Sequence, residues 1–249
     1  MSPFLFVTDL DYTLVGDEKA LKELNYELDK HRQKYGTKIV YATGRSLKLY
    51  KELAKEQSLL EPDALVTSVG TEIYFDSNYE TPDQKWSEKL SDGWNRDLIS
   101  EISEKFEELV LQQQSEQRPF KVSYNLTEKA AEEVLPQLQS ALKNHNLKFN
   151  LIYSGSKDLD ILPLYGDKGL AVKFLQQKWN IDPHTTVVCG DSGNDIALFK
   201  IGEERGIIVG NARPELLEWY NSNLKDYRYL AKSYYAAGIL EGLQHFKFI

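Results

Sequence analysis

The sequence predicts an α/β fold, in which helices cover a parallel sheet and a smaller α/β unit is inserted into the chain. Three observations lead to this prediction. Short apolar runs alternate with helical patterns near the N-terminus, the same alternation returns near the C-terminus, and the block between them has helices and strands of its own. Parallel strands need a crossover connection, usually a helix, so this alternation favours a parallel sheet.

The chain begins with an apolar strand and an amphipathic helix. FLFVT over 4–8 predicts the strand, because it is short and wholly apolar apart from its last residue. Leu21, Leu24 and Leu28 then recur at helical spacing. Gly36 follows, and glycine commonly ends a helix because it adopts a left-handed conformation without strain.

The alternation continues with two further strands. KIVYA over 38–42 and DALVTS over 63–68 predict the second and third strands. Between them, TGRS leads into a helix that carries Tyr50, Leu53 and Ala54 at helical spacing. We therefore expect the first three strands to be joined by helices.

The C-terminal part repeats the pattern. TTVVCG over 185–190 and GIIVG over 206–210 predict strands, with a helix over 194–199 between them. Pro214 predicts the start of another helix, because proline is tolerated in the first turn.

The middle of the chain predicts a separate α/β block. Its expected elements are a helix over 94–109, a strand over 120–126, a helix over 127–143 and a strand over 147–153. Pro136 lies inside the second of these helices, where we expect a kink or a break, because proline removes a helix hydrogen bond.

These patterns predict two domains. Residues 1–80 and 161–249 form the core domain, and residues 81–160 form the inserted cap, with joints near Pro82 and Pro163. The chain of 249 residues is long enough to bury a core in each part.

Composition favours a small-molecule partner. The chain has 30 Lys and Arg against 38 Asp and Glu, a net charge of -8, which argues against nucleic acid or an anionic membrane as a partner. Cys189 is the only cysteine, so no intramolecular disulfide forms. The N-terminal apolar run is too short for a secretory leader, and a cytoplasmic location is expected.

Four aspartates follow predicted strands. Asp9 and Asp11 come after the first strand, and Asp191 and Asp195 lie in the loop CGDSGND. Single aspartates at strand ends are also common in turns and caps. At the carboxyl edge of a parallel sheet, however, four carboxylates would repel one another without a cation. Oxygen-only ligands favour Mg²⁺ over zinc, and Mg²⁺ favours a phosphate-bearing substrate.

Phosphate ligands are expected at the same edge. Thr43 and Gly44 offer a hydroxyl and loop N–H groups near a helix N-terminus, and Lys168 offers a compact positive charge. Taken singly, Thr43 is typical of a helix cap and Lys168 of a solvated surface lysine. Their order along the chain and their position after strands favour the phosphate site.

Together these motifs resemble the haloacid dehalogenase superfamily of phosphohydrolases. That pattern is DxDxT, a Ser or Thr, a Lys and an acidic GDxxxD loop, and here it appears in order at 9–13, Thr43, Lys168 and 190–195. The resemblance implies a Rossmann-like core with an α/β cap of the sugar-phosphatase branch. Tyr12 departs from it, because that position is often small or polar in the superfamily.

The resemblance also implies roles for the aspartates. Asp9 would attack phosphorus and carry an aspartyl-phosphate, and Asp11 would act as acid and then as base. Mg²⁺ would be held by Asp9, by the Leu10–Asp11 segment through its backbone, and by Asp191.

Three further residues would support this chemistry. Asp195 would support the metal site or Lys168, Asn194 would donate a hydrogen bond to a phosphate oxygen, and Lys168 would balance the charge of the phosphate.

Over nearly its whole length the chain also resembles the sucrose-phosphate phosphatase family of cyanobacteria and plants. YATGRS, PDALVTSVGTEIY, QKWSEKLSDGWNRD, FKVSYNL, SGSKDLDILP and AAGILEGLQHF carry the resemblance. It implies hydrolysis of sucrose 6-phosphate to sucrose and inorganic phosphate, the last step of sucrose synthesis. It leaves open a transient association with a sucrose-phosphate synthase.

A disaccharide requires a pocket with several polar side chains. The candidates for substrate contact are Arg45, Glu72, Lys121, Ser123, Tyr124, Ser154, Lys157 and Asp158. SGSKD is also typical of a turn between strands. Trp86 and Trp94 are placed either to stack on sugar rings or to pack in the core.

Two alternatives remain open from the sequence. In the first alternative, the substrate is another sugar phosphate, such as trehalose phosphate or a glycosyl-phosphoglycerate. In the second, the chain is a catalytically inactive carbohydrate-sensing partner of a synthase. The presence of all four motifs argues against the catalytically inactive alternative.

Overall fold

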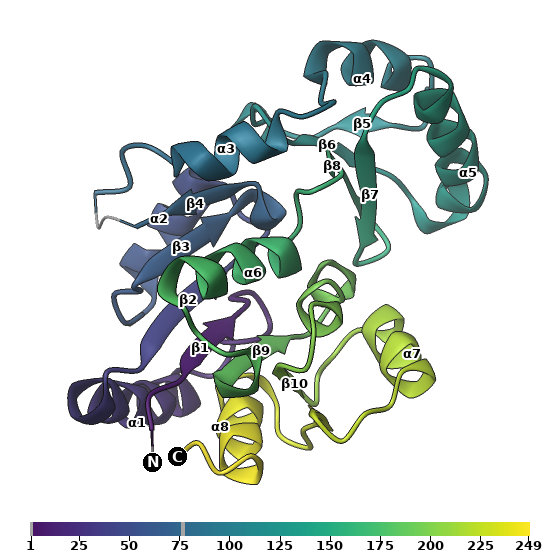
Figure 1. The fold of residues 1–249 in the computed structure, drawn as a ribbon. Helices are drawn as coiled ribbons and strands as arrows, with labels where there is room; N and C mark the ends of the chain where they lie inside the picture. Colours follow the sequence, from purple (N-terminus) through teal and green to yellow (C-terminus); the bar gives the residue numbers. More distant parts are fainter. Residues whose placement is uncertain (1, 76–77) are drawn as a thin grey trace.

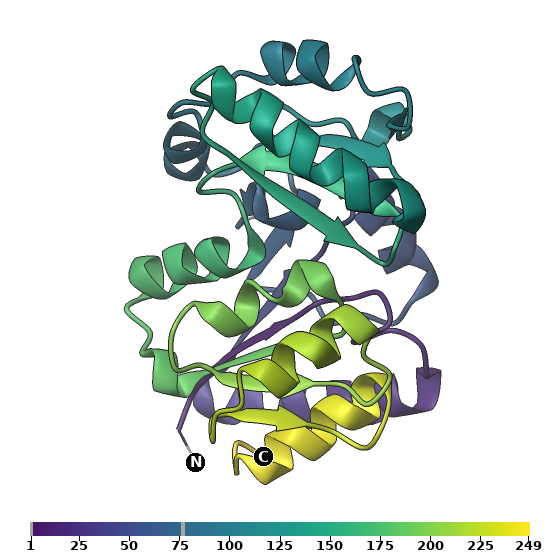
Figure 2. The same ribbon diagram turned by 90° about the vertical axis from the view of Figure 1, so that its right-hand side faces the viewer.

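The computed structural model describes residues 2–75 and 78–249, so Met1, Asp76 and Ser77 of the predicted 1–80 segment lie outside the described residues. Two sheets organise the chain (Figure 1). We call the seven-stranded sheet the core sheet and the four-stranded sheet the cap sheet. Both termini lie at the end of the core that is remote from the cap sheet, as Figure 1 and Figure 2 show.

The core sheet is parallel apart from one edge strand. Its strands in spatial order are β11 (Arg228–Leu230), β10 (Arg205–Ile208), β9 (Thr186–Gly190), β1 (Leu5–Thr8), β2 (Lys38–Ala42), β3 (Ala64–Thr67) and β4 (Glu72–Tyr74). Only the β3–β4 pairing is antiparallel. In the centre, Thr8 of β1 lies opposite Tyr41 and Cys189. The predicted α/β fold with a parallel core is confirmed.

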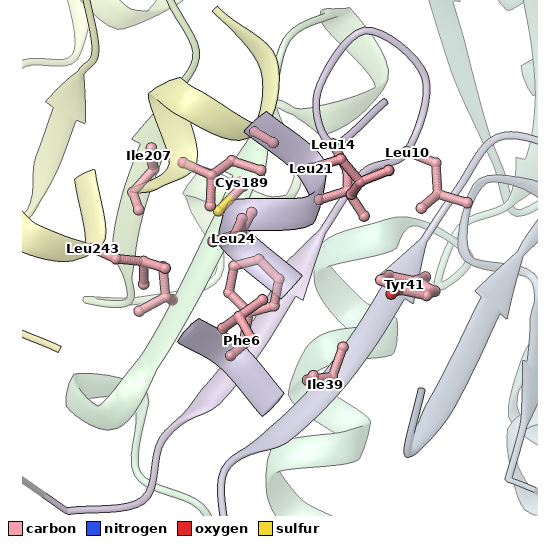
Figure 3. Packing of buried hydrophobic residues seen from close by; sticks show 14 of the residues in the cluster. Phe6, Leu10, Leu14, Leu21, Leu24, Ile39, Tyr41, Cys189, Ile207 and Leu243 are labelled. Atoms are coloured by element: carbon pink, nitrogen blue, oxygen red, sulfur yellow. The ribbon is translucent and has the colours of Figure 1, made fainter. Parts of the chain in front are cut away.

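Helices cover both faces of the core sheet. They are α1 (Glu18–Tyr35), α2 (Leu47–Glu56), α3 (Gln84–Leu90), α6 (Lys168–Trp179), α7 (Pro214–Ser222) and α8 (Tyr235–His245). Alternate residues of β1 face the two layers: Phe6 packs with the α1 and α8 side, shown in Figure 3, and Leu5 and Val7 pack with the α6 side. Burial on both faces explains why β1 is a continuous apolar run. None of the described helices has the length and apolar character to cross a membrane.

The first helix shows how the sequence sets its limits. The Asp17 side chain caps its N-terminus by accepting the backbone N–H groups of Lys19 and Ala20. Gly36 ends it at φ 81°, as predicted, and its N–H donates to the Arg32 carbonyl.

The cap sheet is antiparallel and has its own apolar core. Its strands in spatial order are β5 (Val110–Leu111), β6 (Val122–Asn125), β8 (Asp158–Pro163) and β7 (Phe149–Ser154). Helices α4 (Arg96–Ser103) and α5 (Glu128–Asn144) cover it, with Ile99 and Leu138 packed against Leu159. The predicted boundaries at residues 81 and 160 stay a prediction. Strand β8 runs past residue 160 to Pro163, and Trp86 and Leu90 of α3 pack on the core sheet.

The predicted helix over 194–199 is wrong. The segment forms two short 3-10 helices, η4 (Gly193–Asp195) and η5 (Leu198–Lys200). The Asp195 side chain accepts the backbone N–H groups of Asp191 and Ser192, and such local bonds compete with regular helix geometry.

Two predictions for the cap also need correction. Helix α4 ends at Ser103, before the predicted end at residue 109. A helix that continued to residue 109 would place Glu104 and Glu108 four residues apart on one face, where their like charges repel. Helix α5 runs without interruption from Glu128 to Asn144 and includes Pro136, so a break at that residue is excluded.

Leu24 tests the packing of α1 against the core sheet. It is fully buried, so Leu24→Ala should lower the free energy of unfolding by about 2–5 kcal/mol. Tyr26→Ala on the same helix is the control: Tyr26 is 65% exposed, and we expect a change within about 0.5 kcal/mol. Urea unfolding of both variants measures this difference, and equal losses would contradict the assigned packing.

Candidate active site

A cluster of charged side chains lies at the carboxyl ends of the two central strands of the core sheet. Asp9 follows β1, and its backbone N–H donates to the Cys189 carbonyl of β9 at 3.0 Å. Asp191 directly follows β9. Lys168 is the first residue of α6, whose N-cap is Asp167. The strand ends and the helix start therefore bring together residues that are far apart in the sequence.

Lys168 is the cation at the centre of this cluster. Its side chain is fully buried, and Nζ donates to Asp9 Oδ1 at 2.6 Å and to Asp195 Oδ1 at 2.7 Å. These distances are those of strong charge-assisted hydrogen bonds. The alternative of a solvated surface lysine is therefore excluded.

Asp195 is held by several donors. In addition to Lys168, which binds Oδ1, the backbone N–H groups of Asp191 and Ser192 donate to Oδ2 at 3.0 and 3.1 Å. Both carboxylate oxygens are therefore engaged. This arrangement suits a residue that orients the loop and Lys168.

Asp191 is held in place by a residue of the DLDYT motif at 9–13. Thr13 Oγ1 donates to Asp191 Oδ1 at 2.8 Å, which explains the hydroxyl residue at the end of DLDYT. Asp9, Asp191 and Asp195 each offer a carboxylate oxygen within 4.8 Å of the other two, and all three are buried. Three buried carboxylates with one lysine leave excess negative charge, so the donor set fits a hard cation.

Burial shifts the proton affinities of this cluster. It raises the pKa of Asp9 well above its ordinary value, and Lys168 only partly opposes this. Burial, aided by the nearby Asp195 carboxylate, raises the pKa of Asp191 to about 7. Burial disfavours the charged form of Lys168, but the carboxylates of Asp195 and Asp9 outweigh it and raise the pKa of Lys168. A metal ion would relieve the repulsion between the carboxylates.

Asp11 lies apart from this group. Strand β1 ends at Thr8, so Asp9 and Asp11 do not share one face of a strand. The Asp11 carboxylate instead forms two bonds with Arg45, from Nε and Nη2, both at 2.7 Å. Asp11 is partly exposed, and the metal role predicted for its backbone stays a prediction.

The segment after β2 supplies the second motif. Thr43 is fully buried, and its hydroxyl accepts the Arg45 backbone N–H at 3.1 Å. The cap of helix α2 is Ser46, so Thr43 is not the N-cap residue. Nearby, Asn194 has a buried Oδ1 without a hydrogen-bond partner among the described residues. The phosphate contacts predicted for Thr43 and Asn194 stay predictions.

A cavity of ≈ 510 Å³ opens between the charge cluster and the cap sheet. The predicted site residues that line it are Asp9, Asp11, Gly44, Arg45, Lys121, Ser154, Lys157, Asp158, Asp191 and Asn194. Core and cap thus face one space, which is large enough for a small-molecule ligand.

Charged residues also form the cap wall of the cavity. Lys121 Nζ lies 3.3 Å from Asp160 Oδ1 and 3.5 Å from Glu116 Oε2, and all three side chains are buried. Ser123 Oγ donates to Asp160 at 2.5 Å. Sequence reasoning missed Glu116 and Asp160. The KDLD pattern held a signal for Asp160, because Asp158 and Asp160 lie two apart on β8 and face the same side.

Several other candidates do not line the cavity. Glu72 accepts hydrogen bonds from Thr67 and Arg118, and Ser123 and Tyr124 are buried in the cap sheet. Their predicted sugar contacts stay predictions. Trp86 packs in the core, where its Nε1 donates to the Gly70 carbonyl, and neither Trp86 nor Trp94 lines the cavity.

Tyr12 occupies the rim of the cavity. Its backbone has φ 59°, a conformation that is uncommon for a bulky residue, and the Asn211 side chain donates to its carbonyl at 2.7 Å. The Arg213 guanidinium lies 5.3 Å from the centre of its ring. The departure from a small residue is therefore accommodated because the ring points outwards to solvent and Arg213.

Lys168→Met tests the charge balance of the cluster. The substitution leaves Asp9 and Asp195 buried without their cation, and removing one partner of a buried pair costs about 3–5 kcal/mol. A carboxyl group with a raised pKa stabilises the fold while protonated and loses that contribution as the pH rises through the raised value. The loss should therefore be larger near about pH 8 than near about pH 5, where Asp9 and Asp191, whose pKa values burial raises, are more fully protonated.

Urea unfolding with a chelator present measures this loss at both pH values. Lys173→Met, an exposed position on the same helix, is the control and should change little. A loss of equal size at both pH values would contradict the assigned charge balance.

Sequence comparison places this site in a known family. Residues 2–247 match the family model for sucrose-6F-phosphate phosphohydrolase. The chain is 41% identical over 251 residues to a protein described as probable sucrose-phosphatase 2 of Arabidopsis thaliana. That match covers 98% of the chain and 59% of the plant protein, so the chain spans about three fifths of the length of this relative.

Solved structures agree with this result. The sucrose-phosphatase of Synechocystis sp. PCC6803, determined with sucrose and phosphate, is 43% identical, and the match has a TM-score of 0.92 over 99% of both chains. A haloacid dehalogenase-like hydrolase of Bacillus subtilis shares the fold at 19% identity, with a TM-score of 0.68 over 98% of this chain and 92% of that one. The chain belongs to the sucrose-6F-phosphate phosphohydrolase family, within the haloacid dehalogenase superfamily.

Proposed function

We propose that the chain is a Mg²⁺-dependent phosphatase that hydrolyses sucrose 6-phosphate to sucrose and inorganic phosphate. The observation that carries the proposal is the buried cluster of Asp9, Asp191, Asp195 and Lys168. Asp9 and Asp191 line a cavity whose opposite wall is polar. Family membership supports the substrate, because members of the family with this fold are described as sucrose-phosphatases.

The chain's own residues fit a Mg²⁺ ion. Asp9 and Asp191 would hold it with the backbone of the Leu10–Asp11 segment, while Asp195 keeps its bonds to Lys168 and the loop. Bound Mg²⁺ would neutralise charge on the phosphoryl group during transfer. The raised pKa values of Asp9 and Asp191 support this assignment. Burial disfavours the charged form of both carboxylates, and the nearby cationic side chains only partly offset it.

Asp9 is the proposed nucleophile. Lys168 binds its Oδ1, so Oδ2 is the oxygen left to attack phosphorus. The new P–O bond forms on Asp9 as the bond from phosphorus to the sugar oxygen breaks, which gives an aspartyl-phosphate and, once the leaving oxygen takes up a proton, the free sugar. Thr43, Gly44, Asn194 and Lys168 would bind the phosphate oxygens during this step.

Asp11 is the proposed proton carrier. It donates a proton to the leaving sugar oxygen, and its carboxylate then removes a proton from the water that attacks the aspartyl-phosphate. The P–O bond to Asp9 breaks in this second step, releasing inorganic phosphate. Because Asp11 is bound by Arg45 through two bonds, it must exchange this partner for the leaving oxygen before it acts. Arg45 would then be free to contact the substrate.

The cap residues would select the sugar. Lys121, Ser154, Lys157 and Asp158 line the cavity opposite Asp9, and their polar groups match the hydroxyls of a disaccharide. A site that hydrogen-bonds substrate hydroxyls rejects analogues that leave these groups unpaired. The comparisons give no partner protein, and an association with a synthase remains outside this proposal.

Hydrolysis of a panel of sugar phosphates tests the proposal. We expect sucrose 6-phosphate to be cleaved with a kcat/KM at least about tenfold above those of trehalose 6-phosphate and a glycosyl-phosphoglycerate. A chelator should abolish phosphate release and Mg²⁺ should restore it, whereas Ca²⁺ should not, because its longer bonds and larger ligand number disturb in-line geometry.

The outcomes separate the parts of the proposal. Full activity after exhaustive chelation would contradict the metal site. Preference for another sugar phosphate would leave the phosphatase chemistry in place and show that the named substrate is wrong. Failure to release phosphate from any member of the panel would favour the inactive carbohydrate-sensing alternative.

A further inference from the structure

A short cap segment, residues 116–118, makes two polar contacts with the core. Ser46 Oγ donates to Glu116 Oε1 at 2.7 Å, and Arg118 Nε donates to Glu72 Oε1 at 2.8 Å. Glu116 lines the cavity, whereas Arg118 and Glu72 do not. The contact between Ser46 and Glu116 therefore connects the core to a wall of the cavity.

Glu116 reaches Lys121 with its second oxygen. Oε2 lies 3.5 Å from Lys121 Nζ, and Lys121 lies 3.3 Å from Asp160 Oδ1. Both separations exceed the ~2.7–2.9 Å of a strong charge-assisted hydrogen bond. Since an ammonium group has three donors, Lys121 retains the capacity to bind a further oxygen in the cavity.

Ser46 is directly connected to the catalytic side of the cavity. It caps helix α2 and follows Arg45, which holds Asp11 through two bonds of 2.7 Å. A continuous path of hydrogen bonds and one peptide link therefore runs from Asp11 through Arg45, Ser46 and Glu116 to Lys121. The path joins Asp11, the proposed proton carrier, to the cap wall of the cavity.

A contribution to the stability of the fold does not explain well why charged side chains are buried in the cap wall. Glu116, Lys121 and Asp160 are each less than 10% exposed and carry a net charge of -1 together. A buried ion cluster is often replaced by apolar side chains without loss of stability. A need for fixed polar groups beside a ligand explains the cluster better.

We propose that Glu116 is a positioning residue for the sugar. Its bond to Ser46 fixes the cap wall relative to the core, and its second oxygen holds Lys121 where a sugar hydroxyl meets it while the phosphate lies against Asp9. The inference rests on the proposed function, because it assumes a phosphate ester whose alcohol part reaches the cap wall. A small aryl phosphate, which does not reach Lys121, should not depend on this link.

A double-mutant cycle tests the link. Ser46→Ala, Glu116→Ala and the double variant are assayed with sucrose 6-phosphate and with para-nitrophenyl phosphate. We expect Ser46→Ala to lower kcat/KM for the sugar phosphate about tenfold, chiefly through KM, and Glu116→Ala to lower it at least as much. The double variant should be no worse than Glu116→Ala, because both single changes remove the same bond. Activity on the aryl phosphate should stay within about twofold.

Two variants control for structural effects. Ser46→Thr keeps a hydroxyl at the helix cap and should restore activity on the sugar phosphate. Thr127→Ala removes the N-cap hydroxyl of α5 away from the cavity and should leave both substrates unaffected. Thermal unfolding of each variant confirms that it is folded.

The contrary outcomes are distinct. Independent, multiplicative losses in the double variant, or equal losses on both substrates, would overturn the positioning role. If the wild-type protein prefers a different sugar phosphate, the substrate named under the proposed function is wrong, and the same cycle on the preferred sugar phosphate still decides whether Glu116 positions the sugar.

Discussion

The ammonium of Lys168, buried between Asp9 and Asp195, is the interaction on which the site depends. Without it, the carboxyl ends of β1 and β9 would hold three buried carboxylates with no internal cation. The lysine compensates only part of that charge, and burial still raises the pKa of Asp9 and Asp191. The remaining imbalance fits a bound cation, and it supports the proposal that Mg²⁺ and a phosphoryl group bind at this edge of the sheet.

Much of the fold was predictable because local patterns and tertiary packing agree. The apolar run before Asp9 is a central strand buried on both faces, and Gly36 ends α1 in the left-handed conformation that favours glycine. Prediction failed where side chains override propensity. The 193–200 segment is not one helix, because Asp195 binds backbone N–H groups of its own loop, a contact that periodicity does not reveal.

The core side of the site was also more predictable than the cap side. Motif spacing predicted that Asp9, Thr43, Lys168 and Asp191 lie at one edge of the sheet, because each follows a strand or begins a helix there. It did not show that Asp11 pairs with Arg45 or that Glu116 reaches Ser46. The first contact joins two core segments that lie 34 residues apart. The second joins segments that lie 70 residues apart, and it depends on how the cap lies over the core.

In the proposed mechanism, Asp9 carries the phosphoryl group. The most direct measurement is rapid acid quenching of the enzyme during turnover of radiolabelled sucrose 6-phosphate, followed by proteolysis and mass spectrometry of the labelled peptide. We predict a covalent phosphate on the peptide that contains Asp9, formed at a rate no slower than turnover and absent from Asp9→Asn. Steady release of phosphate with no label on Asp9 at any quench time would contradict the role of Asp9 as nucleophile.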